Sequence, residues 1–116
     1  MRVEHRGEGT ARTLATDVEV ADTFVAKARG LMFRRSVPDD YALVFPFEEV
    51  GRHDLHMIFV PFDIDALWLV GGEVVQKKRL RAWRGRGVAR AETILELPAG
   101  AADGVEEGDT VRVVED

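Results

Sequence analysis

The chain has 116 residues, the usual size of a single domain, and its 46% hydrophobic and 32% charged residues allow one buried core. It contains no cysteine, which excludes disulfides, thiolate chemistry and cysteine-based metal sites. The formal net charge of −5 disfavours general nucleic-acid binding, which requires a basic surface. We therefore expect one globular domain over residues 1–116.

The N-terminal residues Met1 to Arg6 are mostly charged or polar and lack the apolar stretch of a signal peptide. The uncharged apolar runs, such as Ala66 to Val70, are far shorter than the roughly 20 residues that span a bilayer. Both observations predict a cytoplasmic protein with no membrane partner. Most of the basic residues are arginines, and this bias together with the acid excess would suit a halophile's high-salt cytoplasm. High genomic GC content would produce the same arginine bias.

The N-terminal quarter predicts two strands and one short helix. Residues Arg2 to His5 and Thr13 to Val20 are expected to be strands, and the second shows the period-2 alternation of a half-buried strand. Asp22 is placed to cap a helix over Thr23 to Arg29, because its side-chain oxygen can accept from the first free backbone N–H groups. Gly30 is the expected end of that helix.

Short apolar runs dominate the rest of the chain and predict strands at Tyr41 to Phe47, Leu55 to Val60, Ala66 to Val70, Glu73 to Gln76, Thr93 to Leu97 and Thr110 to Val114. Gly71-Gly72 predicts a two-residue hairpin turn, and Pro98 to Gly104 one helical turn. The expected core includes Leu67, Leu69, Val74, Val75, Leu95 and Leu97. We predict a mostly β (α+β) fold, a small antiparallel barrel-like or sandwich-like domain with one short helix near residues 22–30.

Six short segments follow one another in an order and spacing that resemble those of a known family. They are Gly30-Leu31-Met32-Phe33-Arg34, Ala42 to Phe47, Val60 to Asp65, Gly72 to Val75, Leu95 to Gly100 and Gly108-Asp109. They resemble domain-of-unknown-function family 192, also called uncharacterised protein family 0127, over about residues 23–113, in a form similar to haloarchaeal members. The resemblance implies a small β-barrel-like α/β domain and no established activity, cofactor or substrate. The family's Trp-Met-Lys-Asn-Thr tract corresponds here to Asp54, Leu55, His56, Met57 and Ile58, so its polar groups are largely replaced.

A basic stretch is the most informative feature of the sequence. Its members are Lys77, Lys78, Arg79, Arg81, Arg84, Arg86 and Arg90, with Trp83 among them and no acid between them. Without these seven charges the remainder of the chain carries −5 − 7 = −12. We predict a non-enzymatic binding or interaction module in which Arg79, Arg81, Trp83, Arg84, Arg86 and Arg90 contact an anionic ligand or protein partner. The alternative is a solvated loop whose arginines pair with the chain's own acids.

A second hypothesis is a small-molecule-binding or hydrolytic cleft near His56, Asp63 and Asp65, since two carboxylates can divide acid and base roles. The only serine, Ser36, sits in a proline turn, so no paired nucleophile supports an enzyme. Asp54 and His56 would share a face of a strand, but a metal would need a third ligand from elsewhere, such as His5 or Asp63. We expect no metal site and no cofactor.

Overall fold

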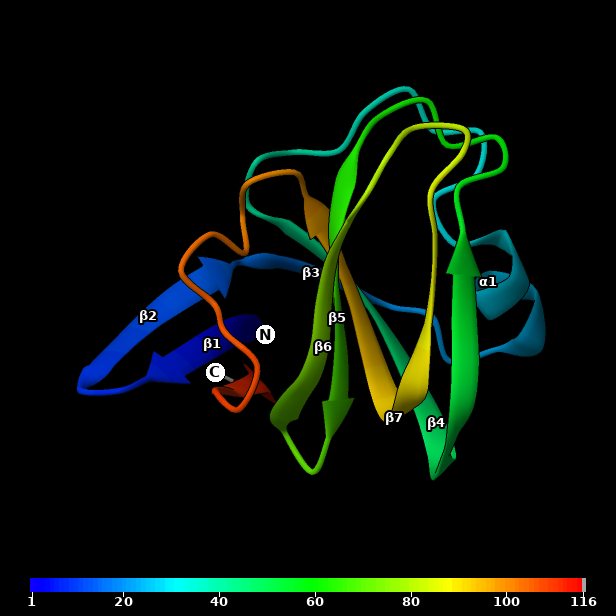
Figure 1. The fold of residues 1–116 in the computed structure, drawn as a ribbon. Coiled ribbons are helices and arrows are strands. Elements are labelled where there is room, and N and C mark those ends of the chain that lie inside the picture. The colour runs from blue at the N-terminus through cyan, green and yellow to red at the C-terminus, as the bar shows by residue number, and fades with distance from the viewer. Residues whose placement is uncertain (116) are drawn as a thin grey trace.

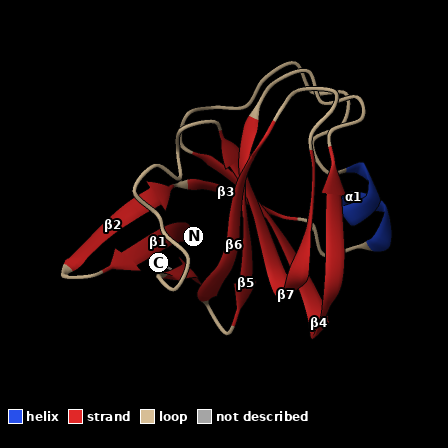
Figure 2. Ribbon diagram, in the orientation of Figure 1, coloured by secondary structure: helices blue, strands red, loops and turns tan. Residues whose placement is uncertain are grey.

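The computed structural model describes residues 1–115, and most of its regular structure is β (Figures 1 and 2). In chain order the elements are β1 (Arg2–Gly7), β2 (Thr10–Ala15), β3 (Asp17–Val20), α1 (Phe24–Arg29), β4 (Tyr41–His56), β5 (Ile64–Val70), β6 (Glu73–Leu80), β7 (Arg86–Pro98) and β8 (Thr110–Val114). The predicted mostly β fold with one short helix is confirmed. Within residues 1–115 no helix is long and apolar enough to cross a bilayer.

All eight strands belong to one sheet, in the order β2-β1-β8-β6-β5-β7-β4-β3. This order is linear, with β2 and β3 at its ends, so barrel-like closure is not part of the observed pairing. Strands β3 and β4 pair in parallel, and the prediction of a purely antiparallel sheet is wrong for this pair. Parallel neighbours require a crossover connection, usually with a helix, and α1 lies in the segment that joins these two strands.

Strand β5 is buried on both faces and separates two hydrophobic clusters. Leu67 and Leu69 belong to the first cluster, with residues of β1, β2 and β8, whereas Ala66 and Trp68 belong to the second. Strands β4 and β7 alternate between the clusters in the same way, because successive residues of a strand point to opposite faces. A strand covered on both faces has no polar face, which explains its continuous apolar run.

Strands β4 and β7 form a bent antiparallel pair. Residues 43–46 of β4 pair with residues 93–96 of β7, and after a register irregularity between Pro46 and Gly51, residues 51–56 pair with residues 86–91. We call this second section, residues 51–56 and 86–91, the β4–β7 arm. Figure 1 shows both strands turning sharply, so that the arm folds back beside the rest of the sheet.

Trp68 holds the arm in place. Its indole Nε1 donates a hydrogen bond of 3.1 Å to the backbone oxygen of His53, and its side chain is fully buried. A Cβ atom on Gly87 would lie 2.6 Å from Trp68 Cη2, closer than carbon atoms approach without displacement. The ring therefore fits against β7 only because residue 87 is glycine.

The Gly71-Gly72 hairpin is confirmed, since both glycines have positive φ angles, of 57° and 84°. Five of the six predicted core residues are buried, but Val75 is 36% exposed and that prediction is wrong. The register of β5 against β6 pairs Leu69 with Val74 and Trp68 with Gln76, which leaves Val75 as an extra residue.

Three local predictions are corrected. Thr23, not Asp22, caps α1, because its side-chain oxygen accepts from Ala26 N at 3.0 Å. The predicted strand over residues 55–60 ends at His56, where Val60 N bonds to Met57 O at 3.0 Å and closes a turn. Residues 98–105 form successive turns instead of a helical turn, with positive φ at both glycines in this segment.

Gly87→Ala should lower the free energy of unfolding by about 1–3 kcal/mol, because the new methyl group overpacks the fully buried Trp68 ring. Gly51→Ala is the matched control in the same arm, since its nearest neighbour would be His53 Nε2 at 3.4 Å, and its effect should stay within about 0.5 kcal/mol. Urea unfolding measures both values. Equal stability of the two variants would contradict the role assigned to Trp68.

Candidate binding surface

Three loops meet at one end of the molecule, seen at the top of Figure 1. They are residues 30–36 after α1, residues 57–63 between β4 and β5, and residues 81–85 between β6 and β7. Phe33 N donates to Phe59 O at 2.8 Å, and Trp83 N donates to Val60 O at 3.0 Å. These backbone bonds tie the loop after α1 and the loop after β6 to the middle loop.

Each loop places an aromatic residue in the left-handed backbone region. The φ angles are 69° at Phe33, 61° at Phe59 and 68° at Trp83, and these are the only non-glycine positive values within residues 1–115. The same side chains are 66%, 49% and 57% exposed. A left-handed conformation costs an ordinary residue about 1–2 kcal/mol, and a half-exposed ring recovers little of that by burial. The Phe33 and Phe59 rings stack on each other with centroids 4.9 Å apart.

The turn over residues 81–85 is tightly built. Gly85 N donates to Arg81 O at 2.8 Å, and a Cβ on Gly85 would lie 2.6 Å from Arg81 N. Ala82 N donates to Asp63 Oδ1 at 2.8 Å, so the Asp63 carboxylate holds this turn from the neighbouring loop. The position of Trp83 is therefore set by the backbone on both sides.

Arg81, Arg84 and Arg86 are exposed, and within residues 1–115 none of the three forms an ion pair. Arg81 and Arg84 flank Trp83 in the turn, and Arg86 begins β7 opposite His56. These residues, with Phe33, Ile58, Phe59 and Trp83, form what we call the aromatic–arginine end.

Two other residues of the predicted basic surface lie elsewhere. Arg79 Nε donates to Asp65 Oδ1 at 2.6 Å, and its Nη2 lies 3.5 Å from Asp103 Oδ1. Arg90 lies within the β4–β7 arm, where it is paired in register with Arg52. The structure thus gathers four of the six predicted residues, Arg81, Trp83, Arg84 and Arg86, and separates the other two from them.

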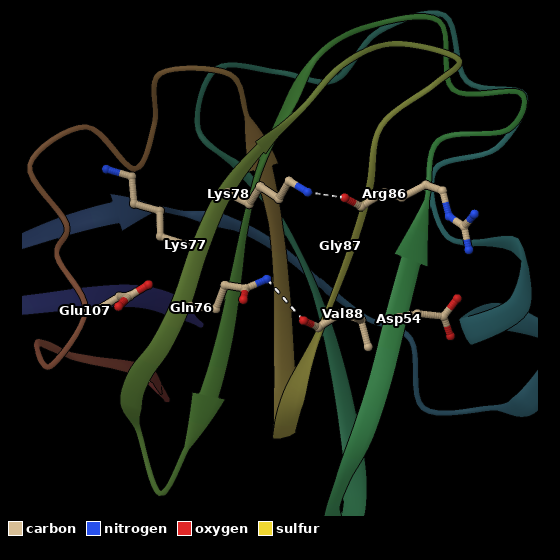
Figure 3. Close-up of a pocket in the computed structure, with 8 residues that line it drawn as sticks. All are labelled: Asp54, Gln76, Lys77, Lys78, Arg86, Gly87, Val88 and Glu107. Carbon is tan, nitrogen blue, oxygen red and sulfur yellow. Dashed lines mark hydrogen bonds between the residues drawn. The ribbon is translucent and has the colours of Figure 1, made fainter.

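The lysines of the basic stretch brace the backbone. Lys78 Nζ donates to Arg86 O, and Gln76 Nε2 donates to Val88 O at 3.3 Å, so two side chains of β6 reach the arm across a groove of about 530 Å³ (Figure 3). Figure 3 also shows the Arg86 side chain directed away from Lys78, toward β4. Lys77 Nζ donates to Val105 O at 2.9 Å. These ammonium groups are engaged within the fold.

The residues of the predicted cleft are not brought together. Asp65 is buried, and its Oδ2 accepts from Gly100 N at 2.9 Å and from Ala102 N at 3.1 Å. With Arg79 on its other oxygen, Asp65 anchors the turns that follow β7, while Asp63 holds the 81–85 turn. His56 lies at the end of the arm and lines a different hollow, described below.

No three histidine, aspartate or glutamate side chains within residues 1–115 are placed to hold a metal ion. His5, suggested from the sequence as a third ligand, instead has its Nε2 2.8 Å from Asp109 Oδ2. His53 stacks on Phe47 with ring centroids 3.6 Å apart. The histidines are thus distributed over separate local contacts.

Sequence reasoning missed Glu96. This residue is 4% exposed, and its Oε1 has no hydrogen-bond partner. Burial raises the pKa of Glu96 to about 8, against a weaker lowering by the charge of Arg34. The available signal was an acid between Leu95 and Leu97 in a strand expected to be buried, a position where a carboxyl group is rare.

Replacing Trp83 tests the backbone strain. Trp83→Gly should be more stable than Trp83→Ala by about 1 kcal/mol, because only glycine adopts φ near 68° without cost and both variants remove the indole equally. The control is Val88, an exposed residue within β7, where alanine should be the more stable substitution by about 0.5–1 kcal/mol. The same order at both positions, measured by thermal or urea unfolding, would contradict the strained conformation.

The pKa of Glu96 predicts a pH dependence of stability. Because the folded-state pKa of about 8 exceeds the ordinary 4.5, unfolding releases a proton between these values. The contribution of Glu96 is therefore most favourable below about pH 4.5 and declines until the pH passes about 8. We expect wild-type stability, measured relative to Glu96→Gln, to fall by up to about 1.4 kcal/mol per pH unit in this window. A pH-independent difference would show that Glu96 titrates normally.

The chain matches the model of DUF192, described as "Uncharacterized ACR", over residues 4–113. It is 37% identical over 98 residues to a UPF0127 protein of Thermococcus kodakarensis, covering 81% of this chain and 62% of that protein. It thus spans less than two thirds of that relative's length. A UPF0127 protein of Pyrococcus horikoshii is 35% identical over 102 residues, covering 83% of this chain and 86% of that protein.

The fold is shared with a crystal structure of a protein of unknown function from Novosphingobium aromaticivorans. The TM-score is 0.84 at 22% identity, over 97% of this chain and 84% of that chain. The relatives named above are not haloarchaeal, so the haloarchaeal affinity stays a prediction. The family match covers nearly the whole chain, and the chain belongs to the DUF192 family.

Proposed function

We propose that this chain is a non-enzymatic binding module that recognises an acidic protein partner through its aromatic–arginine end. One observation carries the proposal: three exposed aromatic side chains stand in left-handed loops beside arginines that have no ion pair within residues 1–115. Neither the strain nor the exposure stabilises the isolated domain. Both are accounted for if the rings and guanidinium groups are buried in a complex. A cytoplasmic location remains part of this proposal.

The composition of this end favours a protein partner over a nucleic acid. Protein interfaces are enriched in aromatic residues and arginine and depleted in lysine, and the aromatic–arginine end contains no lysine. Ile58 is 53% exposed and has no ring on which a base could stack. The net charge of −5 also repels a long phosphate polymer outside the contact itself.

Charge complementarity favours an acidic partner. Arginine presents a planar fork that binds carboxylates through two parallel hydrogen bonds. Asp63 is an acid close to the 81–85 turn, and its carboxylate accepts a hydrogen bond from Ala82 N of that turn. A partner whose surface carries carboxylates and apolar side chains would contact both the guanidinium groups and the aromatic rings of the aromatic–arginine end. Attraction between the unlike charges would also raise the association rate.

The test compares two double variants with the same change in charge. Arg81→Ala/Arg84→Ala removes arginines beside Trp83, and Arg52→Ala/Arg90→Ala removes the facing pair in the arm. The probe is a short synthetic peptide rich in glutamate and phenylalanine, titrated by following Trp83 fluorescence, since the other tryptophan, Trp68, is fully buried. We expect the first variant to bind about tenfold more weakly, the second to bind like wild type, and both to keep their stability within about 1 kcal/mol.

Salt and competing polymers complete this test. Wild-type affinity for the peptide should fall as salt rises, because exposed charges are screened. Oligothymidylate should bind more weakly than the peptide. Tighter binding of oligothymidylate, or equal loss of peptide binding in both double variants, would refute recognition of an acidic protein by this end.

A further inference from the structure

The buried Glu96, which is not part of the aromatic–arginine end, lines a separate hollow. Glu96 lies near the C-terminal end of β7 and faces the second hydrophobic cluster, on the same side as Ile94. Its Oε1 atom is buried without a hydrogen-bond partner. An unpaired buried carboxyl oxygen is costly, and such groups commonly acquire a partner when a ligand binds.

The hollow lies between the end of α1 and the β4–β7 arm and has a volume of about 230 Å³. Figure 1 shows α1 standing beside the arm. Glu96 and Phe45 line it from the sheet side, Val60 lines it from the 57–63 loop, and Gly30 lines it from the helix side. A Cβ on Gly30 would lie 3.5 Å from Glu96 Oε1, so the absence of a side chain keeps the space beside this oxygen open.

The polar groups around the hollow are mostly hydrogen-bond donors. Lys27 and Arg29 line it from α1, and both carry positive charge. His56 Nδ1 accepts from Ile58 N at 3.3 Å, which leaves Nε2 of the neutral ring as a donor. Glu96, when protonated, also donates through its O–H. Asp54 is the remaining acid that lines the hollow.

The geometry assigns to this hollow a binding site for a small carboxylate that carries a hydroxyl or oxo group. The ligand's carboxylate would meet Lys27 and Arg29, and its second oxygen would meet Glu96 and His56. The volume of about 230 Å³ suits a ligand with a short carbon chain. Leu55 and Phe45 would contact that chain.

A neighbouring hollow strengthens the assignment. It has a volume of about 280 Å³, shares Lys27 and Asp54 with the first, and is also lined by His53. His53 Nε2 is a second buried polar atom without a hydrogen-bond partner. Glu96 Oε1 and His53 Nε2, both without hydrogen-bond partners, thus belong to residues that line two adjoining hollows.

The test uses lactate and pyruvate as probes, with propionate and isopropanol as matched compounds that lack the second oxygen or the carboxylate. Amide chemical shifts of the full chain report binding, and the changes should centre on Gly30 and Leu55. We expect dissociation constants on the order of 1 mM for lactate or pyruvate, and about tenfold weaker binding of propionate and isopropanol. This result does not depend on the aromatic–arginine end.

Four variants assign the contacts. Glu96→Leu should abolish the preference for lactate or pyruvate over propionate, whereas Glu96→Gln, which keeps a donor and an acceptor, should retain it. Arg29→Ala should weaken binding about tenfold, and the control Arg90→Ala, which lines neither hollow, should leave it unchanged. If thermal melting shows that Glu96→Leu does not fold, the comparison of Arg29→Ala with Arg90→Ala decides. The assignment is overturned if no shifts occur at Gly30 and Leu55, if propionate binds equally well, or if Arg29→Ala binds like wild type.

Discussion

The packing of Trp68 against Gly87 is the contact on which the rest of the structure depends. The indole ring of β5 occupies space that any side chain at residue 87 would fill, and its N–H bonds to the backbone of His53. One buried ring thus contacts both strands of the β4–β7 arm. Because the arm is folded back here, the loops that leave its two strands meet at one end, and α1 lies against its side. Both proposed sites border this arm.

The buried acids Asp65 and Glu96 show how the fold treats its polar groups. Asp65 accepts from Arg79 on both oxygens and from two backbone N–H groups on Oδ2, so its burial is compensated and it fixes the turns after β7. Glu96 is equally buried in the same sheet but has an oxygen with no partner. The first is an anchor for the fold. The second costs stability, and its position beside an open hollow is what connects it with ligand binding.

The basic stretch divides in a similar way. Arg79 is paired with acids, and the lysines are bonded to backbone oxygens, so part of the stretch neutralises and braces the fold. Arg81 and Arg84 lie in a tight turn that depends on Gly85, and neither forms an ion pair within residues 1–115. That turn also places Trp83 outward at a positive φ angle. The local backbone thus separates the paired arginine from the unpaired ones.

The sequence by itself determined the family, the mostly β fold, the Gly71-Gly72 hairpin and most of the core of β5 and β7, because these follow from short-range periodicity, turn chemistry and the order of motifs. It also indicated exposed arginines around Trp83. Only the tertiary structure decided which acids meet which bases, so Asp63 and Asp65 proved to be local anchors, and Glu96 the unpaired group. The bend of β4, the exposure of Val75 and the left-handed aromatics likewise depend on register and on contacts between residues distant in the chain. Such contacts leave no periodic signal, because they are set by how strands align in space and not by the residues beside them.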